Sequence, residues 1–186
     1  WALGFRNPFR FTIKPGTGYG DLENGHPGVI YLTDVGETKW EEINIIRDGG
    51  KNYGWPIYEG QDFHTAGYAD LISYNTSAEN PLYNNGQCDQ PYFSFQELLV
   101  NENESHNYFF PNPCNNSLEI PNSIPTFSHE RPAIAYRNGW AGPPETYIPT
   151  YDEDGESNYT SISDSESTLT GETFKGFSGN GGTFIN

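Results

Sequence analysis

The chain has 186 residues, a formal net charge of −16 and a pI near 4.3. This acidity excludes nucleic acid and disfavours an anionic membrane surface as partners, because both require a basic protein surface. Its 21 glycines and 14 prolines predict many turns and short strands rather than a helical bundle, and its length suits one domain.

The first sixty residues predict strands separated by turns. Three short runs of apolar β-forming residues are bounded by turn-forming residues, at 9–13, 29–34 and 42–47. Residues 14–28 predict a turn that is long for a hairpin. Five polar residues lie between the runs, where a purely structural strand would not require them: Arg6, Asn7, Asp34, Glu41 and Glu42. We therefore place the functional chemistry in residues 4–60.

Residues 61–125 predict a loop-rich insertion, because Asn, Pro, Tyr and Ser dominate and apolar periodicity nearly vanishes. Cys88 and Cys114 lie in this segment and fit no CxxC or Cys/His metal spacing. Two separate buried thiols or one disulfide would explain them. We favour the disulfide, which would stabilise the closed loop by ~3.5 kcal/mol on the chain-entropy model. A disulfide indicates an oxidising compartment, and hence a secreted, extracellular or periplasmic protein.

Residues 126–186 predict further strands. The run 132–136 alternates like a strand, and a glycine-rich passage leads into a last strand at the C-terminal end. The acidic, serine-rich stretch 150–168 predicts a solvated loop. Strand–turn alternation along the chain predicts an all-β fold, with sandwich, barrel and propeller all open. No apolar run approaches the length of a membrane span. The absence of methionine and the strand-like ends suggest a piece of a longer protein.

Four motifs follow one another near the N-terminal end: Gly4-Phe5-Arg6-Asn7-Pro8, Asp34-Val35-Gly36, Trp40-Glu41-Glu42-Ile43-Asn44, and Gly49-Gly50 followed by Asn52-Tyr53-Gly54-Trp55-Pro56. In order and spacing they resemble the soluble quinoprotein sugar dehydrogenases, a family that includes glucose/sorbosone and aldose sugar dehydrogenases and hedgehog-interacting-protein-like proteins. The long turn at 14–28 and the extra Lys51 depart from the family pattern. Beyond Gly60 the resemblance is thin, and it returns at 131–134 and 170–182.

The resemblance implies a six-bladed β-propeller, of which this chain would form about two or three blades with long loop insertions. Residues 1–60 would be the blades that carry the motifs, 61–125 the loop-rich insertion, and 126–186 further blade strands with the acidic loop 150–168. The remaining blades, or another chain, would then be partners that cover its open edges.

The resemblance also implies an activity: oxidation of a sugar, from aldose to lactone, by hydride transfer to pyrroloquinoline quinone (PQQ) with the help of calcium. A sugar and an electron acceptor would be the partners. Arg6 and Asn7 match residues that contact PQQ in the family, where a guanidinium can stabilise the charge that develops on the quinone. From the residues alone, an ion pair for Arg6 and a turn-capping role for Asn7 are the simpler interpretation.

Four more positions match calcium ligands of the family. Gly36 and Glu37 fall where two backbone carbonyls bind the calcium of PQQ, and Glu37 replaces a proline of the glucose dehydrogenases, so the loop loses stiffness. Glu42 and the Tyr53 carbonyl match a second, structural calcium site, although a solvated acid at the end of a strand explains Glu42 equally well. The tryptophans of the motifs predict core packing rather than sugar binding.

The resemblance places the catalytic base, a histidine, before Trp1, and the basic residues that hold the PQQ carboxylates after Asn186, so we assign no catalytic residue within the chain. None of its four histidines has the pattern of a base: His26, His64, His106 and His129. A second hypothesis is a propeller without catalysis that serves as a carbohydrate- or protein-binding adhesion module. The segments 61–125 and 150–168 favour it, because long loops often carry recognition.

Overall fold

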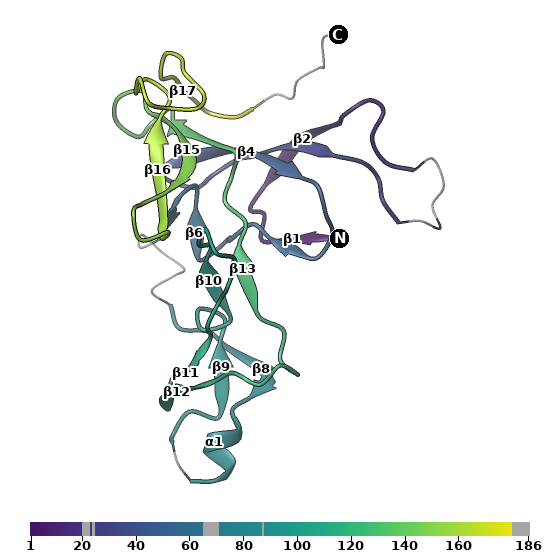
Figure 1. Cartoon of the computed structure of the whole chain (residues 1–186), viewed down its shortest axis with the longest axis vertical. Coiled ribbons are helices and arrows are strands. Elements are labelled where there is room, and N and C mark those ends of the chain that lie inside the picture. The colour runs from purple at the N-terminus through teal and green to yellow at the C-terminus, as the bar shows by residue number, and fades with distance from the viewer. Residues whose placement is uncertain (20–22, 24, 65–70, 87, 180–186) are drawn as a thin grey trace.

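The structure is a computed structural model that describes residues 1–19, 23, 25–64, 71–86 and 88–179. Within these residues it consists of short strands with one helical turn, α1 (Pro81–Asn84), which confirms the predicted all-β class. Figure 1 shows an elongated molecule, with the sheet that contains β2, β4, β15 and β16 at one end and α1 with β8, β9, β11 and β12 at the other. The division into propeller blades stays a prediction.

The largest sheet places its strands in the order β16-β15-β14-β4-β3-β2, each antiparallel to its neighbour, with β17 parallel to β14. The bounds of its strands are β2 (Pro8–Ile13), β3 (Ile30–Asp34), β4 (Trp40–Ile46), β14 (Ile134–Asn138), β15 (Thr146–Tyr151), β16 (Ser157–Ser161) and β17 (Lys175–Gly176). The strands predicted at 9–13, 29–34, 42–47 and 132–136 are therefore confirmed, with bounds that differ by one to two residues.

A smaller, parallel sheet has the strand order β1-β5-β13-β10. Its strands are β1 (Ala2–Leu3), β5 (Lys51–Asn52), β10 (Leu99–Asn101) and β13 (Phe127–His129). The side chains of Leu32, Ile46 and Tyr53 form a buried cluster that connects the two sheets, and Phe5 stacks on Tyr53 with 4.5 Å between ring centroids. This packing fixes the N-terminal motif against the motif that contains Tyr53.

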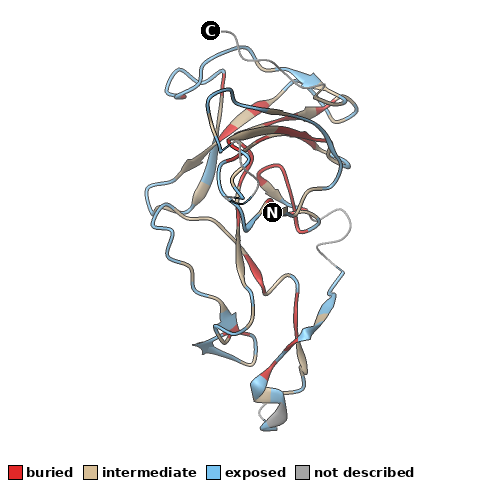
Figure 2. Cartoon of the chain, turned by 90° about the vertical axis from the view of Figure 1, so that its right-hand side faces the viewer, coloured by how far each residue is buried: buried red, intermediate tan, exposed pale blue. Residues whose placement is uncertain are grey.

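Buried residues gather in the large sheet, as Figure 2 shows. Strand β4 is buried along most of its length, although three of its seven residues are polar. Glu41, Glu42 and Asn44 are all less than a tenth exposed. Buried carboxylates require hydrogen-bond donors, since leaving one unpaired is costly. The polar side chains of β4 therefore point to a built polar site beside it.

Residues 71–86, 88–98 and 110–125, here called the arm, form the far end of the molecule (Figure 1), whereas β10 between them belongs to the smaller sheet. The arm contains two antiparallel pairs, β8 (Tyr74–Glu79) with β9 (Tyr92–Ser94) and β11 (Pro111–Asn112) with β12 (Asn115–Glu119). Between the arm and the large sheet lies the hairpin β6 (Tyr58–Glu59) and β7 (Asp62–Phe63). Ala78, Phe93, Leu98 and Ile120 form a small core of the arm's own.

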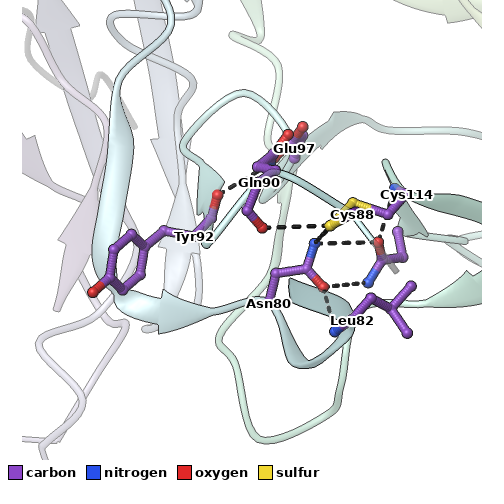
Figure 3. The surroundings of a disulfide bond; sticks show 8 residues. Asn80, Leu82, Cys88, Gln90, Tyr92, Glu97 and Cys114 are labelled. Carbon is purple, nitrogen blue, oxygen red and sulfur yellow. Dashed lines mark hydrogen bonds between the residues drawn. A yellow bond between two sulfur atoms is a disulfide. The ribbon is translucent and has the colours of Figure 1, made fainter. Parts of the chain in front are cut away.

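The predicted disulfide between Cys88 and Cys114 is confirmed, with Cα atoms 5.6 Å apart. Figure 3 shows how Asn80 lies against it: Asn80 Nδ2 donates to Cys114 Sγ at 3.3 Å, and its Oδ1 accepts from Leu82 N and so caps α1. Asn112, which is also buried, donates from Nδ2 to Asn80 Oδ1 at 3.0 Å. The loop-rich insertion is thus a small folded unit around a covalent bond and two buried amides.

The prediction of a solvated loop at 150–168 is wrong in part, because β15 extends to Tyr151 and β16 lies within the stretch. The rings of Tyr147 and Tyr159 pack at 4.8 Å between these strands, and cross-strand packing outweighs the acidic composition. The predicted last strand falls mostly after residue 179, outside the described residues. No helix in the described part of the chain is long and apolar enough to cross a membrane.

Candidate cofactor and metal site

The turn at Arg6 and Asn7 is fixed by its backbone, which leaves both side chains exposed. The backbone N–H groups of Arg6 and Asn7 donate to the two carboxylate oxygens of Asp34, at 2.8 and 2.6 Å. Asp34 ends β3 and is 4% exposed, so its carboxylate is a buried anchor. Hydrogen bonds to an ionised acceptor are about twice as strong as neutral ones. The turn therefore presents its two side chains from a rigid base.

Val35 extends the connection between this turn and the loop after β3. Its N–H donates to the Asn7 carbonyl at 3.1 Å, and its own carbonyl accepts from Arg6 Nη1 at 3.1 Å. The Arg6 guanidinium also lies 5.4 Å from the centroid of the Trp55 ring. The structure thus brings three of the motifs together, with Arg6 between the loop that follows Asp34 and the aromatic ring of the fourth motif.

The 36–40 loop, from Gly36 to Trp40, wraps around the buried carboxylate of Glu59. Glu59 Oε1 accepts from the backbone N–H groups of Glu37 at 2.7 Å, Thr38 at 2.8 Å and Lys39 at 3.1 Å, and Oε2 accepts from Thr38 Oγ1 at 2.9 Å. In a trans peptide the carbonyl points opposite to the N–H of the next residue. The carbonyls of Gly36 and Glu37 are therefore directed away from Glu59, toward the more exposed side of the loop.

Gly36 is required by a close approach of the chain to itself. A Cβ atom at Gly36 would lie 1.6 Å from the Trp40 carbonyl oxygen and 2.7 Å from Glu59 Oε1. No side chain fits there without movement of the backbone. Position 37 also needs a residue with an N–H group, because the N–H of Glu37 donates to Glu59. The proline of the glucose dehydrogenases could not make this bond.

Gly36→Ala is expected to lower the free energy of unfolding by about 2 kcal/mol, because the added methyl group overlaps backbone atoms that cannot rotate away. Urea unfolding followed by tryptophan fluorescence measures the change. Gly171→Ala is the control, because its Cβ would meet only Ile162 Cδ1 at 3.7 Å, an ordinary contact. Equal unfolding midpoints for the two variants would contradict the close approach at Gly36.

Burial dominates the electrostatics of the carboxylates around the loop. It raises the pKa of Asp34, raises the pKa of Glu41 to about 7, and raises the pKa of Glu42 to about 8. For Glu42, repulsion from Asp34 adds to the effect of burial. Burial also acts on Glu59, but the donors of the 36–40 loop outweigh it and lower its pKa. Glu59 is therefore ionised at neutral pH.

Glu42 and Tyr53, the predicted ligands of a second calcium, have different neighbours. Glu42 accepts from Gly60 N at 2.6 Å and from Asn44 Nδ2 at 3.1 Å. Tyr53 follows β5, and its N–H donates to the Leu3 carbonyl at 2.9 Å. No three His, Cys, Asp or Glu side chains in the described part of the chain are grouped to hold a metal. The second calcium site at Glu42 and the Tyr53 carbonyl stays a prediction.

The histidines differ in their surroundings. His129 is fully buried, and burial lowers its pKa to about 3, so it is neutral and packs flat on Tyr58 at 4.3 Å. His64 is buried with Nε2 at 3.4 Å from Glu59 Oε2, and its ring lies 5.2 Å from the Trp55 ring. His26 lies in the exposed turn before β3. His129 therefore has the surroundings of a core residue rather than of a base.

Two anchors of the site were not assigned a role from the sequence. Asp34 was singled out as an unexplained polar residue, but its partners lie about thirty residues earlier in the chain. Glu59 was not singled out, although it is an acid within the apolar and aromatic segment 53–60. An acid inside such a segment is a signal for a buried carboxylate with dedicated donors.

Comparisons with known proteins find similarity in the part of the chain that contains this site. Residues 1–89 match the family described as Glucose / Sorbosone dehydrogenase. The chain is 35% identical over 94 residues to the HIPL1 protein of Arabidopsis thaliana, and 42% identical over 60 residues to the HIPL2 protein of the same plant. These alignments cover 48% and 32% of the chain but only 12% and 7% of the two relatives. No solved structure gives a significant match.

Proposed function

We propose that the chain is part of a secreted quinoprotein that oxidises sugars, from aldose to lactone, with PQQ and calcium, because residues 1–89 match the glucose/sorbosone dehydrogenase family. One observation carries the proposal: Asp34 and Val35 hold the Arg6–Asn7 turn against the start of the 36–40 loop, with Arg6 and Asn7 exposed. The remaining propeller blades, the sugar and an electron acceptor belong to the same proposal. The disulfide supports secretion.

In this function the chain's own residues bind and orient. The Arg6 guanidinium, positioned by the Val35 carbonyl and the Trp55 ring, offers a positive charge that would stabilise an anionic quinone oxygen. Asn7 adds an exposed amide beside it. The carbonyls of Gly36 and Glu37 supply hard oxygen ligands, the type that calcium prefers. PQQ, when bound, supplies the acceptor of the hydride. Glu42 and the Tyr53 carbonyl stay the proposed ligands of a second, structural calcium.

Arg6→Ala in the full-length protein is expected to lower kcat for aldose oxidation about 100-fold after reconstitution with PQQ and calcium, because a preorganised donor to the developing charge is lost. Dye reduction measures kcat, and the absorbance of bound PQQ measures binding separately. Arg10→Ala is the matched control, since Arg10 is an exposed arginine of β2 that lies over the Phe9 ring. Equal losses in the two variants would contradict the assignment of Arg6.

A full-length wild-type protein that folds but neither binds PQQ nor oxidises any aldose would overturn the enzyme proposal. It would favour the alternative, a non-catalytic carbohydrate- or protein-binding module. The observation behind this alternative is the arm, whose surface is mostly exposed (Figure 2) and which projects from the large sheet. Replacement of residues 75–93 by a short glycine–serine linker, together with Cys114→Ser, separates the two functions, because Tyr74 and Ser94 are paired. It would remove most of the recognition surface of the arm but spare β10 and binding of PQQ at the Arg6 turn.

A further inference from the structure

We propose that Glu59 is a positioning residue that sets the calcium affinity of the Gly36 and Glu37 carbonyls. The inference rests on the proposed function, because it assigns a determinant to the same candidate site. Glu59 contacts neither carbonyl oxygen as a ligand would. It acts on the opposite side of the two peptide groups, through their N–H ends.

The geometry of the carboxylate fits this role. Glu59 is 3% exposed and lies in the hairpin of β6 and β7, on a different element from the loop that it holds. A single oxygen, Oε1, collects the N–H groups of three successive residues, from Glu37 to Lys39. The second oxygen is held by the Thr38 hydroxyl at 2.9 Å and lies 3.4 Å from His64 Nε2. The carboxylate can therefore neither rotate nor shift without breaking several bonds.

Successive N–H groups that converge on one point make a cavity for an anion. In this chain the anion is already present, because the ionised side chain of Glu59 fills the cavity. The loop is thus closed to phosphate or other anions on its N–H side, and its Gly36 and Glu37 carbonyls point the other way. A loop held in this way is suited to the opposite charge, a cation.

Two physical effects then act on the carbonyls. The planar trans peptide turns the Gly36 and Glu37 oxygens away from Glu59, so both are oriented before any ion binds. A negative charge at the N–H end also polarises each peptide group and increases the partial negative charge on its carbonyl oxygen. Groups behind the ligands commonly tune metal affinity, and their removal costs 10- to 100-fold. The same reasoning applies to backbone carbonyls held by Glu59.

Glu59→Gln is the test, in the full-length protein and by calorimetric titration with calcium in the absence of PQQ. The amide retains the size of the side chain and one acceptor oxygen but loses the charge. We expect calcium affinity to fall about tenfold or more.

Glu97→Gln is the matched control. Glu97 also accepts from a backbone N–H, that of Ser94 at 2.7 Å, and from Gln90 Nε2 at 2.8 Å, but it lies in the arm. This variant should bind calcium as the wild type does. Thr38→Val provides a milder test if Glu59→Gln does not fold, because it removes only the bond to Oε2; we expect affinity to fall two- to threefold.

The outcomes separate the inference from the function on which it rests. A wild-type protein that binds calcium and PQQ, together with unchanged affinity in Glu59→Gln, or in Thr38→Val where the first variant does not fold, would overturn the role of Glu59 alone. Equal losses of affinity in Glu59→Gln and Glu97→Gln would also overturn it, because the effect would then follow stability. A wild-type protein that binds neither calcium nor PQQ would overturn the proposed function, and the inference with it.

Discussion

Replacement of Asp34 by alanine is expected to lower the free energy of unfolding by about 3 kcal/mol, since two hydrogen bonds to a charged group contribute about 1.5–3 kcal/mol each. The raised pKa of Asp34 shows that its burial is costly, and removal of the carboxylate recovers part of that cost. We therefore take the lower end of the range. The variant should also release the Arg6–Asn7 turn, since the N–H groups of both residues lose their acceptor.

Asp34→Asn should have an intermediate effect, because an amide oxygen can accept from one N–H group while the amide nitrogen faces the other as a second donor. Urea unfolding measures stability, and amide exchange at residues 6 and 7 measures the release of the turn. Asp48→Ala is the control. Asp48 is exposed after β4, and its replacement should change the free energy of unfolding by no more than about 0.5 kcal/mol. An unchanged exchange rate at residues 6 and 7 in Asp34→Ala would refute the anchor.

Replacement of both Cys88 and Cys114 by serine is expected to cost the arm about 3.5 kcal/mol, on the chain-entropy model for a loop of this length. The small core of the arm cannot offset such a loss, because only four buried apolar residues form it. We expect the arm to unfold locally while the large sheet persists. Hydrogen exchange should then rise in residues 71–98 and 110–125 and stay low in β3 and β4.

Wild-type protein treated with a reducing agent should reproduce the double variant, which controls for the two substitutions themselves. Limited proteolysis offers an independent readout, with first cleavage expected within the arm. Equal protection of the arm with and without the disulfide would show that the buried amides of Asn80 and Asn112 and the small core suffice to fold it.

The fold was predictable where apolar runs are long enough to carry a period. Strands β3 and β4 follow from their runs of Ile, Leu, Tyr and Asn between turns. The strands of the parallel sheet have only two or three residues, which is too short to show a period. Their pairing is set by contacts between residues far apart in the chain. β16 was missed for a related reason: its acidic and serine-rich surroundings predict a loop, and only the pairing with β15 makes it a strand.

The candidate site was predictable as a set of residues but not as an arrangement. The motifs identify Arg6, Asn7, Gly36 and Glu37, and the structure brings their segments together. What holds them is Asp34 from β3 and Glu59 from β6, acids whose partners depend on how the chain returns to itself. Local patterns show that an acid is unusual among apolar neighbours, but they do not show which N–H groups it will meet. The role of such residues needs the tertiary structure.

The position of β14 has a consequence for the order in which the sheet assembles. Strands β2, β3 and β4 pair with their sequence neighbours across residues 14–29 and 35–39, whereas Ile134 of β14 pairs with Ile43 of β4 across about ninety residues. The disulfide removes 26 residues from that loop, which lowers its closure cost by only ~0.3 kcal/mol. Local pairs form sooner than distant ones. The three N-terminal strands, with Asp34 at their end, therefore assemble first, and β14 docks onto them as a late and slower event.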